Sequence, residues 1–185
     1  VRALNAIHQG FFETNKRLAL AVIGVGNVGG AVLGQLEQQR RYLLSKGFDV
    51  TVVGLANSKR FLADANGIDL GDWKNDLRHA SNRMDARTFA RRIGEMDITN
   101  VALVDCTSGP AIVDAYPAFI EANLHIITPN KWANALPWRR YSTLMDMLDR
   151  RKRHFLFEAN VGAGLPIVST LRDLIASGDE IVKIE

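Results

Sequence analysis

The sequence predicts an α/β fold in which helices cover both faces of a doubly wound, mainly parallel sheet. Short apolar runs alternate with segments of helical periodicity along most of the 185 residues. The first apolar run, at 18–23, ends in the pattern G-x-G-x-x-G at 24–29 and passes directly into a helical segment. A hydrophobic fraction of 47% and a charged fraction of 23% are ordinary for a globular protein. Strands and helices that alternate at this spacing indicate parallel strands joined by right-handed crossovers.

The individual elements follow from apolar periodicity and from the glycines and prolines that end each run. Residues 57–84 are polar and interrupted by glycine, so we expect loops there, anchored by Trp73 and Leu77. The expected strands are 18–23, 49–56, 101–105, 125–128 and 154–157. The expected helices are 1–17, 28–46 (ended by Gly47), 85–96, 110–123 (begun by Pro110), 137–153 and 164–177.

The order of these elements predicts three parts of the chain. Residues 1–17 would form a linker helix, with Leu4, Ile7, Phe11 and Phe12 on one side. Residues 18–157 would form a nucleotide-binding domain, and 158–185 a connection and the truncated start of a second, catalytic and dimerisation domain. The chain starts at Val1 and stops in an alternating stretch, 181–185, that indicates a strand just beginning. We therefore expect a piece excised from a longer polypeptide.

Composition and charge argue against several classes of protein. The net charge of +3 comes from scattered lysines and arginines, not from a basic patch interleaved with aromatic residues, so nucleic-acid binding has little support. No apolar run approaches the length of a membrane span, and there is no signal peptide pattern. A single cysteine excludes an internal disulfide and favours a reducing compartment, the cytoplasm.

The glycine pattern at 24–29 predicts a dinucleotide site of the Rossmann type. Gly24 permits the tight turn, Gly26 lets the backbone approach a pyrophosphate, and Gly29 lets the helix pack closely on the strand. The free N–H groups and dipole of the following helix would hold the anion. Val25, Asn27 and Val28 complete this loop.

The end of the second strand predicts the choice of cofactor. A carboxylate at this position would bond the ribose 2′-hydroxyl of NAD. This sequence instead has Asn57, Ser58, Lys59 and Arg60, which offer two cations and a hydroxyl to a 2′-phosphate. NADP(H) is therefore favoured over NAD(H). The alternative is that Lys59 and Arg60 are ordinary exposed charges, and that the site does not discriminate between NADP(H) and NAD(H).

Three later loops would meet at the carboxyl edge of the sheet, where ligands bind in such folds. Thr107 and Ser108 offer hydroxyls to a nicotinamide or substrate, or alternatively only a helix cap before Pro110. Cys106 is interpreted as a buried filler, because no histidine is placed as its base. Lys131 could polarise a carbonyl or bond a cofactor hydroxyl, or be a surface lysine. The glycine-rich loop at 158–166 could gather carbonyls around a hard cation, although its composition alone favours a tight turn.

Five motifs together resemble the homoserine dehydrogenase family. They are V-I-G-V-G-N-V-G at 22–29, A-N-S-K at 56–59, D-C-T-S at 105–108, T-P-N-K at 128–131 and N-V-G-A-G-L-P at 160–166. The likeness runs along the whole chain and is greatest to the dehydrogenase part of bifunctional aspartokinase–homoserine dehydrogenases. It implies NAD(P)-dependent interconversion of L-homoserine and L-aspartate 4-semialdehyde, in the biosynthesis of threonine, methionine and isoleucine. It also implies fusion to an aspartokinase and a homo-oligomeric full-length enzyme.

The resemblance also assigns roles to residues. Gly24, Val25, Gly26, Asn27, Val28 and Gly29 would cradle the pyrophosphate, and Asn57, Ser58 and Lys59 would surround the adenosine 2′ position. Thr107 and Ser108 would line the nicotinamide, and Lys131 would act in cofactor binding and catalysis. The carbonyls of Glu158, Val161, Ala163 and Leu165 would form a sodium site.

The family's principal acid/base lysine lies beyond the region that this chain covers. We therefore expect the 185 residues to bind cofactor but to have little dehydrogenase activity alone. The alternatives are a non-catalytic NAD(P)-sensing module and another NADP-dependent dehydrogenase with a different substrate.

Overall fold

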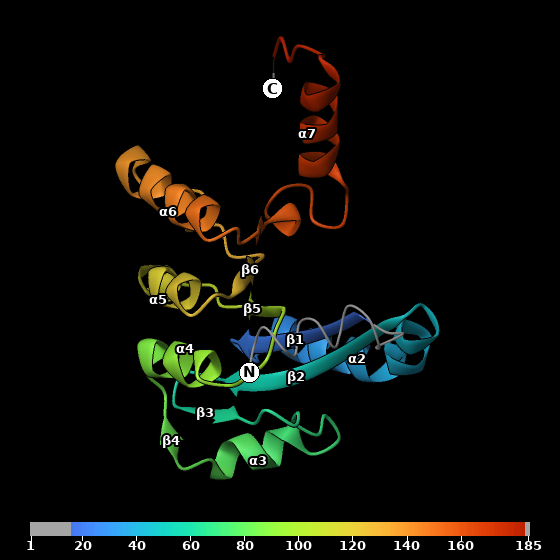
Figure 1. Ribbon diagram of the computed structural model, residues 1–185, viewed down its shortest axis with the longest axis vertical. Coiled ribbons are helices and arrows are strands. Elements are labelled where there is room, and N and C mark those ends of the chain that lie inside the picture. Colours follow the sequence, from blue (N-terminus) through green and yellow to red (C-terminus); the bar gives the residue numbers. More distant parts are fainter. Residues whose placement is uncertain (1–15, 184–185) are drawn as a thin grey trace.

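The centre of the fold is a sheet of seven strands in the order β4-β3-β2-β1-β5-β6-β7, seen in a computed structural model that describes residues 16–183 (Figure 1). Five strands run parallel, and the other two, β3 and β4, are antiparallel to their neighbours. The strands are β1 (Lys16–Ile23), β2 (Phe48–Ala56), β3 (Arg60–Ala63), β4 (Asn82–Arg83), β5 (Val101–Asp105), β6 (His125–Ile127) and β7 (Phe155–Leu156). The predicted α/β, mainly parallel fold is confirmed.

Helices cover both faces of this sheet. On one face lies α2 (Asn27–Ser45), with α3 (Trp73–His79) beside it at the sheet edge. Side by side on the other face are α4 (Ala86–Gly94), α5 (Tyr116–Glu121) and α6 (Trp138–Arg150) (Figure 1). The last helix, α7 (Ile167–Ser177), extends away from the sheet and buries none of its residues. No helix within residues 16–183 is long and apolar enough to cross a membrane.

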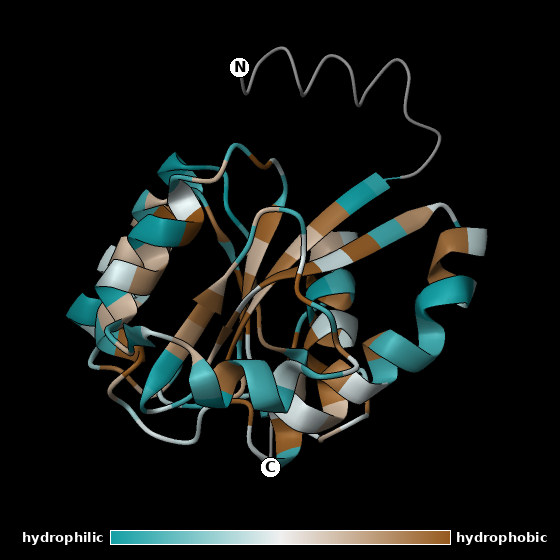
Figure 2. Cartoon of the chain, turned by 90° about the horizontal axis from the view of Figure 1, so that it is seen from below, coloured by the Kyte–Doolittle hydropathy of each residue, from teal (hydrophilic) through white to brown (hydrophobic). Residues whose placement is uncertain are grey.

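The strands are apolar on both sides because both faces are covered. Along β1, Ala19, Ala21 and Ile23 face the larger core, while Val22 faces the smaller core under α2. The larger core is centred on three fully buried rings, those of Phe89, Tyr116 and Phe119. The result is visible in Figure 2, where the central strands are predominantly hydrophobic and the outer sides of the helices predominantly hydrophilic.

The first predicted boundary is wrong by two residues. Residues 1–15 of the expected linker helix lie outside the described residues, but Lys16 and Arg17 belong to β1 and are not helical. The Lys16 N–H donates to the Gly47 carbonyl at 2.7 Å, and the Arg17 guanidinium lies 3.7 Å from the Asp49 carboxylate. The strand therefore continues into charged residues at its exposed end, where an apolar pattern cannot reveal it.

The segment 57–84, expected to be loops, contains β3, α3 and β4. A hairpin joins β2 to β3, and the helix α3 then places Trp73 and Leu77 against the sheet edge, Leu77 fully buried. Both anchors are thus confirmed, but the elements that carry them are short. With four, seven and two residues, they offer too few repeats for periodicity to identify.

Several other expectations about single elements are corrected. The helix expected from Pro110 begins instead as a 3₁₀ turn, η1 (Val113–Ala115), followed by α5, which has Pro117 in its first turn. The helix expected from 164 begins at Ile167. Residues 181–183 form no strand, and 184–185 lie outside the described residues. The strand expected at 154–157 is shorter, because only Phe155 and Leu156 pair with β6.

At the amino ends of β6 and β7, the imidazole rings of His125 and His154 stack with their centroids 5.0 Å apart. His125 Nδ1 accepts a hydrogen bond from the His154 N–H at 3.0 Å, and its Nε2 lies 3.2 Å from the Arg153 guanidinium. Burial lowers the pKa of His125, and the charges of Arg153 and His154 lower it further. A neutral His125 ring is therefore part of the folded edge.

We expect the folded state to lose stability as the pH falls below 6.5, the ordinary histidine pKa. Below this pH, His125 is protonated in the unfolded chain but still neutral in the folded one. The free energy of unfolding therefore decreases until the pH has fallen below the lowered pKa of His125 in the folded state. Urea unfolding at a series of pH values measures this slope. The His125→Gln variant should show a flatter slope, with His79→Gln as the exposed control; an unchanged slope in His125→Gln would contradict the assignment.

Candidate dinucleotide-binding site

A cavity of about 910 Å³ opens at the carboxyl ends of β1, β2 and β5. This is the edge of a parallel sheet at which α/β proteins bind their ligands. The cavity is lined by the turn 24–28, the hairpin tip 57–60, one side of α3 and the first residues after β5. Its lining residues are Gly24, Val25, Gly26, Asn27, Val28, Asn57, Ser58, Lys59, Arg60, Trp73, Lys74, Leu77, Arg78, Cys106 and Ser108.

The three motif glycines have different surroundings. Gly24 has φ +84°, and a Cβ there would lie 2.8 Å from the backbone of Cys106 and Thr107. At Gly29, which is buried, a Cβ would lie 2.4 Å from the Gly24 carbonyl oxygen. A Cβ at Gly26 would meet no atom within 4 Å. Gly24 and Gly29 are therefore needed for the turn itself, whereas Gly26 leaves space at the cavity.

The amino end of α2 is suited to an anion. It begins at Asn27 with no acidic residue in its first turn, and no side chain caps it. Its first N–H groups therefore have neither a side-chain acceptor nor a nearby negative charge. A pyrophosphate at this end would be bound by the N–H groups and by the dipole of a 19-residue helix.

Asn57 shapes the hairpin tip. Its Oδ1 accepts hydrogen bonds from the N–H groups of Lys59 at 2.7 Å and Arg60 at 2.8 Å, and its own N–H donates to the Arg60 carbonyl at 3.0 Å. This closed turn leaves Ser58 and Lys59 exposed at the cavity. The Arg60 guanidinium donates to the Ala80 carbonyl and so ties the hairpin to the end of α3.

Two cations of the cavity come from a helix that the sequence did not reveal. Lys74 and Arg78 are one helical turn apart on α3 and line the cavity with Lys59 and Arg60. No aspartate or glutamate is among the lining residues. The signal that could have identified α3 is the i, i+4 spacing of Trp73 and Leu77, preceded by Asp72 at the N-cap position.

Beneath the cavity, a buried polar network begins at Asp105, the last residue of β5. The Asp105 side chain is fully buried and accepts hydrogen bonds from the Tyr116 hydroxyl at 2.6 Å, the Thr107 N–H at 2.8 Å and the Asn130 Nδ2 at 3.2 Å. Burial raises the pKa of Tyr116 well above its usual range, and the Asp105 charge raises it further, so the hydroxyl remains a donor.

Asn130 connects this network to the loop after β6. It is 3% exposed, and its Nδ2 also donates to Thr107 Oγ1 at 3.1 Å and to the Gly109 carbonyl at 3.0 Å. Its Oδ1 accepts from the Trp132 N–H at 3.0 Å. Sequence reasoning missed the roles of both Asp105 and Asn130. One buried amide thus holds together the two loops that carry Thr107 and Lys131.

Of the residues predicted to bind ligand in these two loops, only one lines the cavity. Ser108 lines the cavity, and its carbonyl accepts a hydrogen bond from the Trp132 indole at 3.1 Å. Thr107 lies underneath, bonded to Asn130, and Lys131 is exposed and outside the lining. Cys106 is only partly buried and lines the cavity, so its interpretation as a buried filler is wrong. Burial raises the pKa of its thiol to about 11, with a further contribution from Asp105, so the thiol is protonated at neutral pH.

The loop after β7 combines a tight turn with a side-chain cap. Gly162 and Ala163 have φ +70° and +53°, and the Glu158 carboxylate accepts from the N–H groups of Val168 and Ser169, each at 2.9 Å. Two of the four carbonyls predicted to bind sodium also accept backbone hydrogen bonds: that of Glu158 from Val161 at 3.4 Å and that of Leu165 from Ile167 at 2.9 Å. Each carbonyl keeps a second lone pair for a cation.

Comparison with known proteins identifies a family over most of the chain. The chain matches the family described as "Homoserine dehydrogenase, NAD binding domain" over residues 24–158. It is 37% identical, over its whole length, to 23% of a bifunctional aspartokinase/homoserine dehydrogenase of Haemophilus influenzae, and 40% identical to 20% of a chloroplastic one of Zea mays. The chain thus spans about a fifth of the length of these curated relatives. These matches do not favour the sensing module.

A solved structure shares the fold. It is titled as a hyperthermophilic archaeal homoserine dehydrogenase in complex with NADPH. Its TM-score to this chain is 0.67 with 20% identity, over 85% of this chain and 49% of that one. At this identity the likeness concerns the fold alone.

Proposed function

Because the chain belongs to the homoserine dehydrogenase family, as its NAD-binding domain, we propose that the 910 Å³ cavity binds NADP(H) in preference to NAD(H). The pyrophosphate would lie against the turn Gly24–Gly29, which comprises Val25, Gly26, Asn27 and Val28 between its end glycines, and the amino end of α2. The gap beside Gly26 and the uncapped helix end support this placement.

The preference for a 2′-phosphate is supported above all by the charge at the adenosine end. Lys59, Arg60, Lys74 and Arg78 line the cavity there, with Asn57 and Ser58 at the hairpin tip. Arginine and lysine form the strong charge-assisted hydrogen bonds that phosphate oxygens accept. The typical partner of a ribose 2′-hydroxyl is instead a carboxylate, and the lining has none.

Calorimetric titration with NADPH and NADH tests this proposal. We expect NADPH to bind more tightly, and Lys74→Gln and Arg78→Gln each to weaken NADPH binding about tenfold with little effect on NADH. Arg92→Gln, which removes an exposed cation of α4 away from the cavity, is the matched control and should change neither affinity. Tighter binding of NADH, or equal losses for both cofactors, would refute the proposed 2′-phosphate site.

For the longer polypeptide, we propose the reaction of the family: interconversion of L-homoserine and L-aspartate 4-semialdehyde, for synthesis of threonine, methionine and isoleucine. NADPH would supply the hydride. Thr107 and Ser108 would line the nicotinamide side, with Thr107 held by Asn130. The exposed Lys131 ammonium, on the loop that Asn130 anchors, would contact cofactor and substrate and stabilise negative charge on the carbonyl oxygen.

The reaction is tested on the full-length polypeptide that contains this domain. NADPH oxidation with L-aspartate 4-semialdehyde should be readily measured, and Lys131→Ala should lower kcat with the fold retained. We also propose that this polypeptide carries an aspartokinase, as its relatives do, that it is a homo-oligomer, and that it acts in the cytoplasm. Absence of turnover with this substrate would refute the proposed reaction while leaving cofactor binding unaffected.

A sodium site on the carbonyls of Glu158, Val161, Ala163 and Leu165 is a further part of the proposal. Within residues 16–183 no group of acidic, histidine or cysteine side chains could hold a metal ion, so the donors would be backbone oxygens. The left-handed backbone at Gly162 and Ala163 supports it, since this conformation turns successive carbonyls towards one side.

A further inference from the structure

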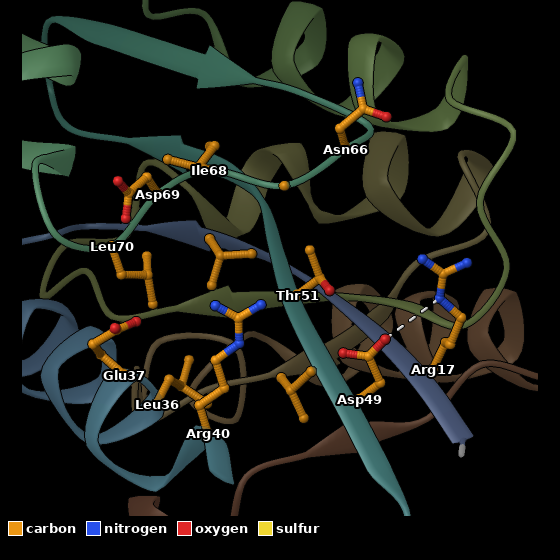
Figure 3. Close-up of a pocket in the computed structure, with 13 residues that line it drawn as sticks. Arg17, Leu36, Glu37, Arg40, Asp49, Thr51, Asn66, Ile68, Asp69 and Leu70 are labelled. Carbon is orange, nitrogen blue, oxygen red and sulfur yellow. Dashed lines mark ion pairs between the residues drawn. The ribbon is translucent and has the colours of Figure 1, made fainter. Parts of the chain in front are cut away.

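A second cavity, of about 430 Å³, lies at the opposite ends of the parallel strands, beside the amino ends of β1 and β2. It is enclosed by the second half of α2, the amino half of β2 and the segment 66–70 that follows β3 (Figure 3). Because β1 and β2 are parallel, their amino ends border this cavity and their carboxyl ends border the first one. The two cavities share no lining residue.

The walls of this second cavity are formed in advance. Leu36, Ile68 and Leu70 line it and pack on the smaller core, to which the buried Val52 belongs. The Ile68 N–H donates to the Val52 carbonyl at 2.7 Å, and the Asp64 N–H donates to Val53 at 2.9 Å, so the segment is held to β2. Three apolar side chains in the floor of the cavity are therefore held by the smaller core and by β2.

Exposed side chains of both charges surround this floor. The Arg40 guanidinium points into the middle of the cavity, with the carboxylates of Glu37 and Asp69 on one side of it (Figure 3). On the other side, Asp49 is paired with Arg17 at 3.7 Å. Among residues 16–183, Arg40 forms an ion pair with no carboxylate, not even with Glu37, which lies one turn away on α2. Asp69 accepts one hydrogen bond, from the Gly71 N–H at 2.9 Å.

We propose that this cavity binds a small zwitterion, an α-amino acid with an aliphatic side chain. Its carboxylate would bind the Arg40 guanidinium, its ammonium group would lie on the side of Glu37 and Asp69, and its side chain would cover Leu36, Ile68 and Leu70. The mixed charges favour a zwitterion over a phosphate, which the carboxylates would repel, and over a simple cation, which Arg40 would repel. The volume suits a small ligand.

The test is a titration of the 185-residue chain with L-valine, followed by the backbone amide signals in ¹H–¹⁵N NMR spectra. We expect millimolar or tighter binding, with shifts at Thr51, Ile68 and Asp69 and none at Gly26, and therefore no dependence on the cofactor cavity. N-acetyl-L-valine, which lacks the ammonium group, and L-valinamide, which lacks the carboxylate, should each bind at least about tenfold more weakly.

Variants assign the binding to the named charges. Arg40→Gln should weaken L-valine binding at least about tenfold, and Asp69→Asn should also weaken it. Arg41→Gln, at the next and exposed position of α2 outside the cavity, should leave it unchanged. Dispersed amide spectra would verify that each variant is folded. Absence of shifts with L-valine, equal binding of N-acetyl-L-valine, or unchanged affinity of Arg40→Gln would each overturn the proposal.

Discussion

Replacing Asp105 with asparagine should lower the free energy of unfolding by about 2–3 kcal/mol. Both carboxylate oxygens accept hydrogen bonds in a fully buried position: one from the Thr107 N–H, the other from Tyr116 and Asn130. An amide of the same shape has only one acceptor oxygen, so its NH₂ group must face a donor. At least one buried donor is then unsatisfied. Urea unfolding followed by circular dichroism measures the loss.

Tyr116→Phe is the graded control for this prediction. It removes one donor from the Asp105 carboxylate without placing a second donor against it, so we expect a smaller loss, of about 1 kcal/mol. Because the same network holds Thr107 beneath the cavity, Asp105→Asn should also weaken NADPH binding more than Tyr116→Phe does. Equal stability of Asp105→Asn and the parent chain would show that the network contributes little.

The second large effect is expected at Gly29. An alanine Cβ would lie 2.4 Å from the Gly24 carbonyl oxygen, which is backbone and cannot rotate away. The turn between β1 and α2 must therefore open, at a cost of about 1–3 kcal/mol in folding. Because this turn and the amino end of α2 form the proposed pyrophosphate site, affinity for NADPH should fall at least about a hundredfold, or about 2.7 kcal/mol. Calorimetry and thermal unfolding measure the two effects.

Gly30→Ala is the matched control for this variant. Gly30 is the next residue of the same helix, and a Cβ there would meet no atom within 4 Å. Alanine should leave NADPH binding unchanged and could stabilise the helix by up to about 1 kcal/mol. If Gly29→Ala bound NADPH as well as Gly30→Ala does, the close packing of the turn would not matter for the cofactor.

The extent to which sequence predicted this fold depended on the length of each element. The apolar runs of β1, β2 and β5 and the long period of α2 were identified to within one or two residues. The elements β3, α3 and β4 were missed because each is too short, or too polar, to show a period. The start of α5 was misplaced because Pro110 lies in an irregular loop ahead of the first helical turn.

The candidate site likewise contains residues that the sequence predicted and residues that it did not. Local chemistry in the sequence was enough for the glycine turn at 24–29, since the motif itself predicts close packing at Gly29, which the structure shows against the Gly24 carbonyl. It was also enough for the hairpin tip, in which the uncharged Asn57 and Ser58 precede the basic Lys59 and Arg60. It was not enough for Lys74 and Arg78, which reach the cavity only because α3 folds back along the sheet edge.

The sequence by itself determined the α/β fold, the dinucleotide turn and the family, because each follows from short patterns, and the residues of each pattern are near one another in the chain. Only the tertiary structure joined Asp105 to Tyr116 and Asn130, 11 and 25 residues further along, and brought Arg40 of α2 and Asp69 to the lining of one cavity. These arrangements depend on which strands lie side by side and on how each helix sits on the sheet. Such contacts arise from packing of the whole core, which no local period in the sequence encodes.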